Sequence, residues 1–342
     1  MEIQANISLK KFNTFGIDAH ARYFARFKTV EELEELIDLQ KTSILDLPAS
    51  IVLGGGSNIL FTKDYDGLIL KNELKGIKKI KEDELHVYVQ VGAGENWHQF
   101  VLYCIENNLG GIENLSLIPG NVGASPMQNI GAYGVEIKDV LYYLEAYSIK
   151  EKAIHTFSLN DCELGYRDSI FKRKYKGEFI ITSVTYRLNK QPHFNISYGA
   201  IKDELEKMKV KELSIKAVSQ AVINIRSSKL PDPAVIGNAG SFFKNSTVAA
   251  SKFNTLKEKF PGIVGYPVHN GDIKLAAGWM IEQCGWKGFR KNDAGCYDKQ
   301  ALVLVNYGKA SGDEIYNLSE EILKSVKDKF HVVLEREVNI IK

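Results

Sequence analysis

The chain has 342 residues and a formal net charge of +2, from 44 lysines and arginines against 42 aspartates and glutamates. Its length allows two or three domains with a substantial core, and the balanced charge provides no broad field for nucleic acid or an anionic membrane. No apolar run approaches a membrane span, the start lacks a signal peptide's apolar region, and the four cysteines show no CxxC spacing. We therefore expect a cytoplasmic protein without membrane insertion, a disulfide framework or a metal site.

The first seventy residues predict a helix and two strands around a glycine cluster. Thr29 and Glu32 form a capping box ahead of an amphipathic helix. Residues 51–53 predict a short buried strand that runs into the sequence GGGSN at 54–58. The bare amides and serine hydroxyl of this cluster can donate to a phosphate, or the cluster can be a tight turn before a strand at 67–70. The local sequence leaves both possibilities open.

A further strand, with Val87, Val89 and Val91 on one face, stops at the sequence GAG before a helix that begins near Trp97. This order resembles a dinucleotide-binding fold, but Trp97 occupies the place of the third glycine. No glycine-rich loop ending in Gly-Lys-Ser or Gly-Lys-Thr occurs in the chain. We therefore expect a fold other than the Rossmann type to hold any dinucleotide.

Residues 111–134, GIENLSLIPGNVGASPMQNIGAYG, contain glycines and prolines throughout and one charged residue, Glu113. Neither a helical nor an alternating hydrophobic period holds across them. Their interleaved apolar residues argue against disorder, and a loop of this length is uncommon in a compact domain unless it has a function. Because glycines let the backbone approach a ligand and present N–H donors, we interpret the stretch as an ordered loop that binds a group such as a pyrophosphate. The alternative is a plain connection between two strands.

The middle of the chain predicts strands at 140–149 and 179–188, rich in β-branched and aromatic residues, and a helix from Ser214. The motif GYRDS lies between the strands. On local sequence alone, its Arg167 and Asp168 favour a surface ion pair with each other.

Two prolines predict a stiff, non-helical connection at 226–233 and thus a domain boundary. Beyond it we expect a helix around 253–260, a second helix with Asp272 as N-cap and a buried strand at 301–305. A long helix at 315–326 then precedes the end of the chain.

The last strand, expected at 332–341, is apolar except for four residues that include Glu335 and Glu337. A carboxylate in such a strand either lies on a solvated face or is held for chemistry. The local sequence favours the solvated face.

Eight stretches in chain order resemble the UDP-N-acetylenolpyruvoylglucosamine reductase family, and together they span nearly the whole chain. They are NTFGID from Asn13, GGGSN from Gly54, IPGNVGASPMQNIGAYG from Ile118, GYRDS from Gly165, KLPDP from Lys229, GNAGSFFKN from Gly237, KLAAGW from Lys274 and QALVLVN from Gln300. One such stretch alone is weak, whereas eight in this order are specific. The segments around Tyr198 and Tyr266 resemble the longer of the two family types.

The resemblance implies an α+β fold, with a vanillyl-alcohol-oxidase/PCMH-type FAD-binding region of two subdomains and an α+β substrate-binding domain. We expect the first FAD-binding subdomain at 1–71 and the second at 72–225, rejoined by a C-terminal strand at 331–342. The substrate-binding domain is expected at 226–330. We expect a monomer whose partners are UDP-N-acetylenolpyruvoylglucosamine and NADPH.

The resemblance also implies FAD as the cofactor, with NADPH as co-substrate. Covalently flavinylated relatives in the wider superfamily often carry a histidine near the first loop, whereas Ser57 follows Gly56 here, so we expect non-covalent FAD. The residues carried over to the cofactor site are Gly54, Gly55, Gly56, Ser57, Asn58, Ser116, Pro119, Gly120, Gly123, Ser125 and Arg226.

The implied reaction reduces the enolpyruvyl group of the UDP sugar to the lactyl group of UDP-N-acetylmuramate, in the synthesis of peptidoglycan precursors. Hydride addition at the terminal carbon places negative charge on the α-carbon and the carboxylate, where a cation or an acid stabilises it. By motif, Arg167 and Glu337 polarise the carboxylate, and Ser241 protonates the α-carbon as general acid, with Lys244 and Asn245 as helpers. The residues carried over to the substrate site are Tyr166, Tyr198, Lys229, Asn245, Tyr266 and Gln300.

Two positions depart from the family pattern, because Arg336 and Ser246 stand where proline is usual. Two other functions remain as alternatives. A flavin-dependent sugar or alcohol oxidase would pass electrons to oxygen and would have no need of the Ser241 and Glu337 pair. A flavin- or nucleotide-binding regulator would bind FAD without turnover.

Overall fold

The computed structural model describes residues 2–41, 50–268 and 270–342. The chain forms two compact units: the first comprises Met1–Ile7, Ala21–Gly55 and Asp66–Ser228, and the second comprises Ser8–His20, Gly56–Tyr65 and Lys229–Lys342. No helix of the described residues is long and apolar enough to cross a membrane. In the same residues, no group of three or more His, Cys, Asp or Glu side chains could hold a metal ion. The finer division at 71 and 225 stays a prediction.

A four-stranded sheet with strand order β1-β2-β5-β3 forms one part of the first unit. Its strands are β1 (Ile3–Ser8), β2 (His20–Phe27), β3 (Ser50–Leu53) and β5 (Tyr65–Asn72). Strand β3 runs parallel to β5, with Leu53 opposite Lys71. The prediction of a strand at 51–53 is confirmed, but its burial is not, because Val52 lies 38% exposed.

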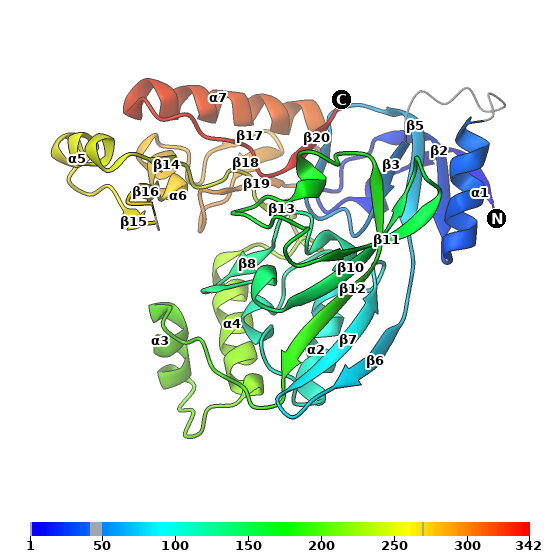
Figure 1. Ribbon diagram of the computed structural model, residues 1–342. Helices are drawn as coiled ribbons and strands as arrows, with labels where there is room; N and C mark the ends of the chain where they lie inside the picture. Colours follow the sequence, from blue (N-terminus) through cyan, green and yellow to red (C-terminus); the bar gives the residue numbers. More distant parts are fainter. Residues whose placement is uncertain (1, 42–49, 269) are drawn as a thin grey trace. The chain divides into compact units, whose positions relative to one another are not determined.

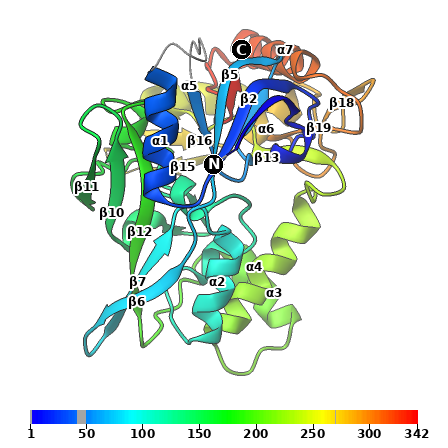
Figure 2. The same cartoon turned by 90° about the vertical axis from the view of Figure 1, so that its right-hand side faces the viewer.

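Helix α1 (Val30–Lys41) lies against this sheet (Figure 2) and buries Leu33 and Leu36 in a core shared with β5. The Thr29 hydroxyl accepts a hydrogen bond from the Glu32 N–H at 3.2 Å. The Glu32 carboxylate accepts one from the Lys28 N–H at 2.6 Å. The helix start predicted from Thr29 and Glu32 is therefore confirmed, with the carboxylate reaching one residue further back than in a standard capping box.

The second sheet of the first unit has the order β11-β10-β12-β7-β6, and all its neighbours are antiparallel. Its strands are β6 (Ile77–Glu82), β7 (His86–Gly92), β10 (Leu141–Ser148), β11 (Ala153–Ser158) and β12 (Phe179–Asn189). Helix α2 (Trp97–Glu106) buries Trp97, Phe100 and Cys104 in the core that contains Val89 and Tyr186. The predictions of β7, α2, β10 and β12 are confirmed.

Helices α3 (Gly199–Lys207) and α4 (Ile215–Lys229) lie side by side in the first unit (Figures 1 and 2) and share a small apolar core. Helix α4 continues through residues 226–229, so the expected non-helical connection begins only after Lys229. The reason is that α4 contains no proline, and the Ser228 hydroxyl donates to the Ile225 carbonyl within the helix at 2.9 Å.

In the second unit, α7 (Gly312–Phe330) packs on a sheet with the order β13-β19-β18-β17 (Figure 1). Its strands are β13 (Gly237–Ser241), β17 (Arg290–Lys291), β18 (Ala294–Cys296) and β19 (Val303–Asn306). A smaller sheet joins β14 (Thr247–Val248), β16 (Ile273–Leu275) and β15 (Gly265–Pro267), next to helices α5 (Ala250–Lys259) and α6 (Ala277–Gln283). The prediction that Asp272 caps a helix is wrong, because residues 273–275 pair with two strands and the helix begins at Ala277.

The last segment forms regular strand only at β20 (Asn339–Ile341), which pairs in parallel with β4 (Ile59–Phe61). Among the described residues, the segment before it forms one isolated β-bridge, between Phe243 and Arg336, together with separate hydrogen bonds. The predicted strand at 332–341 is therefore too long. The remaining short elements are β8 (Gly131–Ala132), β9 (Val135–Glu136) and five single-turn 3-10 helices at Lys10–Phe12, Glu113–Leu115, Val122–Ala124, Ile137–Asp139 and Ile170–Lys172.

Candidate functional site

Residues 111–134 have defined structure without a long regular element, as predicted. The loop is tied to the start of α2, because the Trp97 N–H donates to the Gly120 carbonyl at 3.0 Å and the Gly123 N–H donates to the Ala93 carbonyl at 2.9 Å. A Cβ at Gly123 would lie 2.6 Å from the Ala93 Cβ. The close approach of the two chains therefore requires glycine here.

Two predicted cofactor residues support this loop from within. The Ser116 side chain is fully buried, and its hydroxyl lies 2.7 Å from the Glu113 carbonyl and 2.8 Å from the Ser219 hydroxyl. The buried Ser125 hydroxyl lies 2.7 Å from the Tyr186 hydroxyl. Both hydroxyls are thus hydrogen-bonded inside the protein, where they stabilise the conformation of the loop. Pro119, in contrast, is exposed on the loop.

The first glycine cluster lies against this loop within the first unit. A Cβ at Gly55 would lie 2.7 Å from the Gly120 Cα and 2.9 Å from the Asn121 Oδ1. Among the residues that the structure describes, none accepts a hydrogen bond from the backbone N–H of Gly54, Gly55, Gly120 or Asn121. Two glycine segments in contact therefore present several available N–H donors, an arrangement that suits a phosphate group.

From Gly56 onward the cluster belongs to the second unit. Gly56 has φ +64°, and a Cβ there would lie 1.9 Å from the Phe12 carbonyl oxygen, so the position requires glycine. Ser57 and Asn58 are partly buried, and the Asn58 side chain donates to the Glu337 carbonyl at 3.3 Å. Asn58 therefore fixes the end of the chain in addition to its predicted place at the cofactor.

Arg226, on α4, is a partly buried cation of the first unit. Its Nε atom is shielded from solvent and has no hydrogen-bond partner among the described residues. Burial lowers the pKa of Arg226, and it lowers the pKa of His98, to which the Arg226 charge adds a smaller effect. A shielded guanidinium Nε without an acceptor fits the predicted place of Arg226 in the cofactor site, because it can donate to an anionic group such as a phosphate.

Arg167 has φ +54° in a tight turn, and its guanidinium donates to the Gly131 carbonyl at 2.8 Å. Its Cζ lies 5.4 Å from the centre of the Tyr166 ring. The expected ion pair of Arg167 with Asp168 is wrong, because Asp168 pairs with Arg173 at 2.6 Å. Arg167 is therefore directed towards the end of the loop at 111–134.

Two of the residues carried over to the substrate site, Tyr198 and Tyr266, are both 52% exposed. Tyr198 precedes α3, and its ring meets that of Tyr133 edge-on at 5.5 Å. Tyr266 lies in β15 of the second unit. Their exposure fits residues that contact a ligand at the surface.

Ser241 and Glu337 lie on neighbouring extended segments of the second unit. Ser241 ends β13, and the Glu337 N–H donates to the carbonyl of the next residue, Phe242, at 2.8 Å. Ser241 and Glu337 are partly buried, whereas the Glu335 side chain is 73% exposed and pairs with Lys244 at 3.3 Å. The solvated face favoured by local sequence therefore holds Glu335, while Glu337 is partly buried on the segment that bonds to the residue after Ser241.

The other predicted substrate residues of this unit have structural contacts as well. The Asn245 side-chain oxygen accepts a hydrogen bond from the Ala277 N–H at 3.0 Å, so it caps α6. The Gln300 side-chain oxygen accepts one from the Leu302 N–H at 3.3 Å. Lys229 is exposed at the end of α4. The second unit thus contains Ser241, Asn245, Gln300 and Glu337, and Lys229 begins the last chain segment of this unit.

At the two positions where the resemblance predicts proline, the side chains present hold the C-terminal segment. The Ser246 hydroxyl donates to the Val333 carbonyl at 2.9 Å. Arg336 donates to the Ser319 hydroxyl at 2.8 Å and pairs with Glu320 at 2.7 Å, both on α7. These side-chain contacts fix a segment that a proline would otherwise stiffen.

Sequence reasoning missed two residues that shape the cofactor region. Asn121 donates to the Gly94 carbonyl at 2.8 Å, and its place inside the IPGNVG motif was a usable signal. Lys71 donates to the Gly54 carbonyl at 2.6 Å. Nothing in the local sequence marks Lys71, because its place depends on the pairing of β3 with β5.

Fold and site together define an α+β protein with an FAD-binding region. A family model described as an FAD binding domain matches residues 21–156, which include both glycine segments. A second model, described as the C-terminal domain of UDP-N-acetylenolpyruvoylglucosamine reductase, matches residues 232–341.

Relatives of known name match the whole chain. Proteins named UDP-N-acetylenolpyruvoylglucosamine reductase from Amoebophilus asiaticus and Flavobacterium johnsoniae are each 52% identical over 342 residues, with full coverage of both chains. The crystal structure of UDP-N-acetylenolpyruvylglucosamine reductase from Thermus caldophilus matches with a TM-score of 0.68 at 23% identity, also over both full chains, and shows the same fold. The chain therefore belongs to the UDP-N-acetylenolpyruvoylglucosamine reductase family, an oxidoreductase family. The predicted family, the α+β class and the FAD-binding region are confirmed.

Proposed function

We propose that this protein reduces the enolpyruvyl group of UDP-N-acetylenolpyruvoylglucosamine to the lactyl group of UDP-N-acetylmuramate, with NADPH as the source of electrons. The observation that carries this proposal is the 52% identity, over the full length, to two proteins named for that reductase. The geometry of both units supports it, because the first presents backbone N–H groups suited to a phosphate and the second holds Ser241 and Glu337 on neighbouring, hydrogen-bonded segments.

The residues of the first unit fit FAD. The backbone at Gly55 and at Gly123 lies so close to the neighbouring chain that a Cβ at either position would clash. The available N–H groups of these segments suit a pyrophosphate. Arg226 adds a shielded cation. The chemistry that bound FAD would supply here is the transfer of a hydride equivalent from NADPH to the enolpyruvyl double bond. We propose that it is held without a covalent bond, since Ser57 follows Gly56.

The chain's own residues then stabilise charge and move the proton. Addition of hydride to the terminal carbon leaves negative charge on the α-carbon and carboxylate of the substrate. We assign to Arg167 and Glu337 the polarisation of that carboxylate and the stabilisation of the enol-like intermediate. Ser241 donates its proton to the α-carbon, which completes the lactyl group. Tyr198 and Tyr266 contact the nucleotide end, and Tyr166, Lys229, Asn245 and Gln300 line the site.

An anaerobic spectral titration tests the proposal. NADPH should bleach the flavin absorbance of the purified protein, and UDP-N-acetylenolpyruvoylglucosamine should then restore it without oxygen. Restoration by oxygen but not by the enolpyruvyl sugar would indicate an oxidase. A flavin that NADPH never bleaches would indicate a binding protein without turnover. Acid precipitation should release the flavin to the supernatant, and colour left in the pellet would contradict non-covalent binding.

A further inference from the structure

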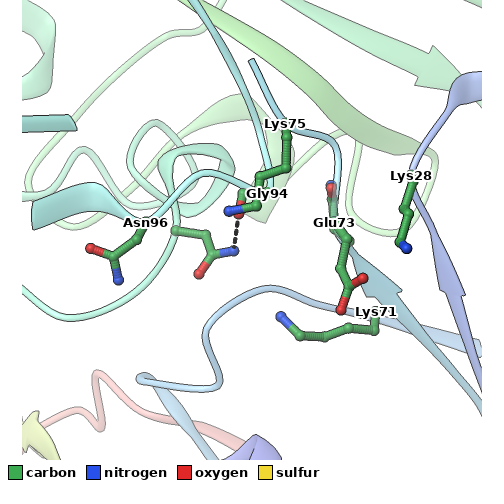
Figure 3. A pocket seen from close by; sticks show the side chains of 8 residues that line it. Lys28, Lys71, Glu73, Lys75, Gly94 and Asn96 are labelled. Atoms are coloured by element: carbon green, nitrogen blue, oxygen red, sulfur yellow. Dashed lines mark hydrogen bonds between the residues drawn. The ribbon is translucent and has the colours of Figure 1, made fainter. Parts of the chain in front are cut away.

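A cavity of about 580 Å³ lies within the first unit, beside β5 and the start of α2. Its lining side chains are basic or carboxamide groups with a single acid: Lys28, Lys71, Asn72, Glu73, Lys75, Asn96 and Asn121, with Gly94 between them. In Figure 3 the ammonium group of Lys71 points from β5 towards the side of the cavity where Asn96 lies. The size suits a nucleotide-sized ligand.

The charges of this cavity are not balanced. Glu73 is paired with Arg26 at 2.9 Å, and Lys75 is paired with Glu95 at 3.2 Å. Neither Lys28 nor Lys71 has a carboxylate partner among the residues that the structure describes. Lys71 is half-buried, and burial lowers the pKa of its ammonium group, although the nearby Glu73 carboxylate opposes that shift. The cavity therefore favours an anionic ligand.

The same cavity abuts both glycine segments. Lys71 donates to the Gly54 carbonyl at 2.6 Å, so its charge is fixed one residue from Gly55. Asn121, on another wall, lies against the Gly55 backbone and donates to the Gly94 carbonyl at 2.8 Å. Asn96 caps the N-terminus of α2, whose positive dipole end therefore lies at the cavity. The backbone N–H groups at Gly54 and Gly55 therefore lie near Lys71, which forms no ion pair with the described residues.

We propose that Lys71 is a cofactor-binding residue of this chain, which holds the first glycine loop by its carbonyl and neutralises phosphate charge at the nucleotide end of FAD. This inference rests on the proposed function. It assigns a role to a side chain that lies outside the glycine motifs. It also predicts a measurable difference between the binding of FAD and that of riboflavin. A residue that acts on phosphate affects FAD but not riboflavin, which has no phosphate.

The experiment measures flavin affinity on the apoprotein, with the fluorescence of FAD or of riboflavin as the readout, for the parent chain, Lys71→Met, Lys71→Arg and Lys63→Met. Lys71→Met should weaken FAD binding at least tenfold and leave riboflavin affinity within about twofold. Lys71→Arg should recover part of the loss, and Lys63→Met, an exposed lysine of the second unit, should bind like the parent. ADP should compete with FAD in the parent and compete less well in Lys71→Met.

Three outcomes would overturn the inference. Equal losses for FAD and riboflavin would mean that Lys71 only holds the loop. Unchanged FAD affinity with a raised KM for NADPH would assign the cavity to the reductant. Unchanged behaviour in every assay would leave Lys71 without a role in binding. If instead the parent protein binds no FAD at all, the proposed function fails together with this inference.

Discussion

The two regions proposed to carry the reaction are built in opposite ways. In the first unit, the glycine segments at 54–55 and 120–123 present backbone N–H groups, while the nearby hydroxyls of Ser116 and Ser125 are bonded inside the protein. In the second unit, Ser241 and Glu337 present side chains from extended segments whose backbones are already hydrogen-bonded. The first region should therefore be sensitive to any added Cβ, and the second to the loss of one functional group.

The largest effect that distinguishes the regions is expected at Glu337. Glu337→Gln should slow enolpyruvyl reduction by orders of magnitude and leave FAD content unchanged, because it removes only a charge in the second unit. Glu335→Gln is the matched control, since that carboxylate is exposed and paired with Lys244. Steady-state kinetics of both variants provide the measurement. A sensitive Glu335 with a tolerant Glu337 would show that the assignment is displaced by two residues.

In the first region, we expect the substitution Gly55→Ala to disturb FAD binding most directly. A methyl group there meets the Gly120 Cα at 2.7 Å, so Gly55→Ala should separate the glycine segments and weaken FAD binding at least about tenfold, which is 1.4 kcal/mol. Gly54→Ala is the neighbouring control, because its methyl group would meet Asn121 only at an ordinary 3.6 Å. Flavin retained after gel filtration checks the pair. Equal retention by the two variants would argue against contact between the loops as the basis of binding.

An intermediate effect is expected for the exposed tyrosines. Tyr198→Phe and Tyr266→Phe should each raise the KM for the enolpyruvyl substrate several-fold, because a surface hydroxyl that contacts ligand is lost while the ring remains. Flavin reduction by NADPH should be nearly unchanged. Measurement of both half-reactions tests this, and equal losses in the two would place the tyrosines nearer to the chemistry than we propose.

The smallest expected effect is on the pH dependence of stability, and it involves Glu113, a buried acid of the loop at 111–134. Glu113 is 3% exposed, and burial raises its pKa from 4.5, although N–H groups that include that of Gly111 oppose the shift. Its folded-state pKa lies above the unfolded value, so its contribution to stability is complete below about pH 4.5 and is lost as pH rises through the raised pKa. Glu113→Gln should remove that decline, a change of no more than about 2 °C in Tm. Melting curves of the parent and of Glu113→Gln, recorded from below pH 4.5 upwards, test this. An identical dependence of Tm on pH in the two proteins would contradict the prediction.

The elements that the sequence predicted are those with a clear hydrophobic period. Helices α1, α2 and α7 and strands β7, β10 and β12 bury regular rows of apolar side chains. Strand β6, with five of its six residues exposed, and β11 lie at the two edges of their sheet and show no such period, so they were missed. Strand β16 was assigned to a helix because its apolar spacing fits both, and only pairing with β14 and β15 decides.

The residues of the candidate site also fall into those that the sequence could predict and those that it could not. Gly55, Gly123 and Ser241 lie in motifs that local chemistry or resemblance could mark. Lys71 lies in no motif, and its position follows from a parallel pairing that sets it opposite Leu53, next to the first glycine. Contacts that depend on strand register between distant segments cannot be inferred from one sequence without the fold.

The central claim is that one region handles the flavin and the other supplies the proton, and Ser241→Ala tests it most directly. A stopped-flow record should show flavin reduction by NADPH at close to the parent rate, because that step needs no proton donor at the substrate carbon. Reoxidation by the enolpyruvyl sugar should slow by about 10²–10⁴-fold, and Ser241→Cys should recover part of the loss. Reoxidation of Ser241→Ala at the parent rate would contradict the account, since the proton would then come from another group.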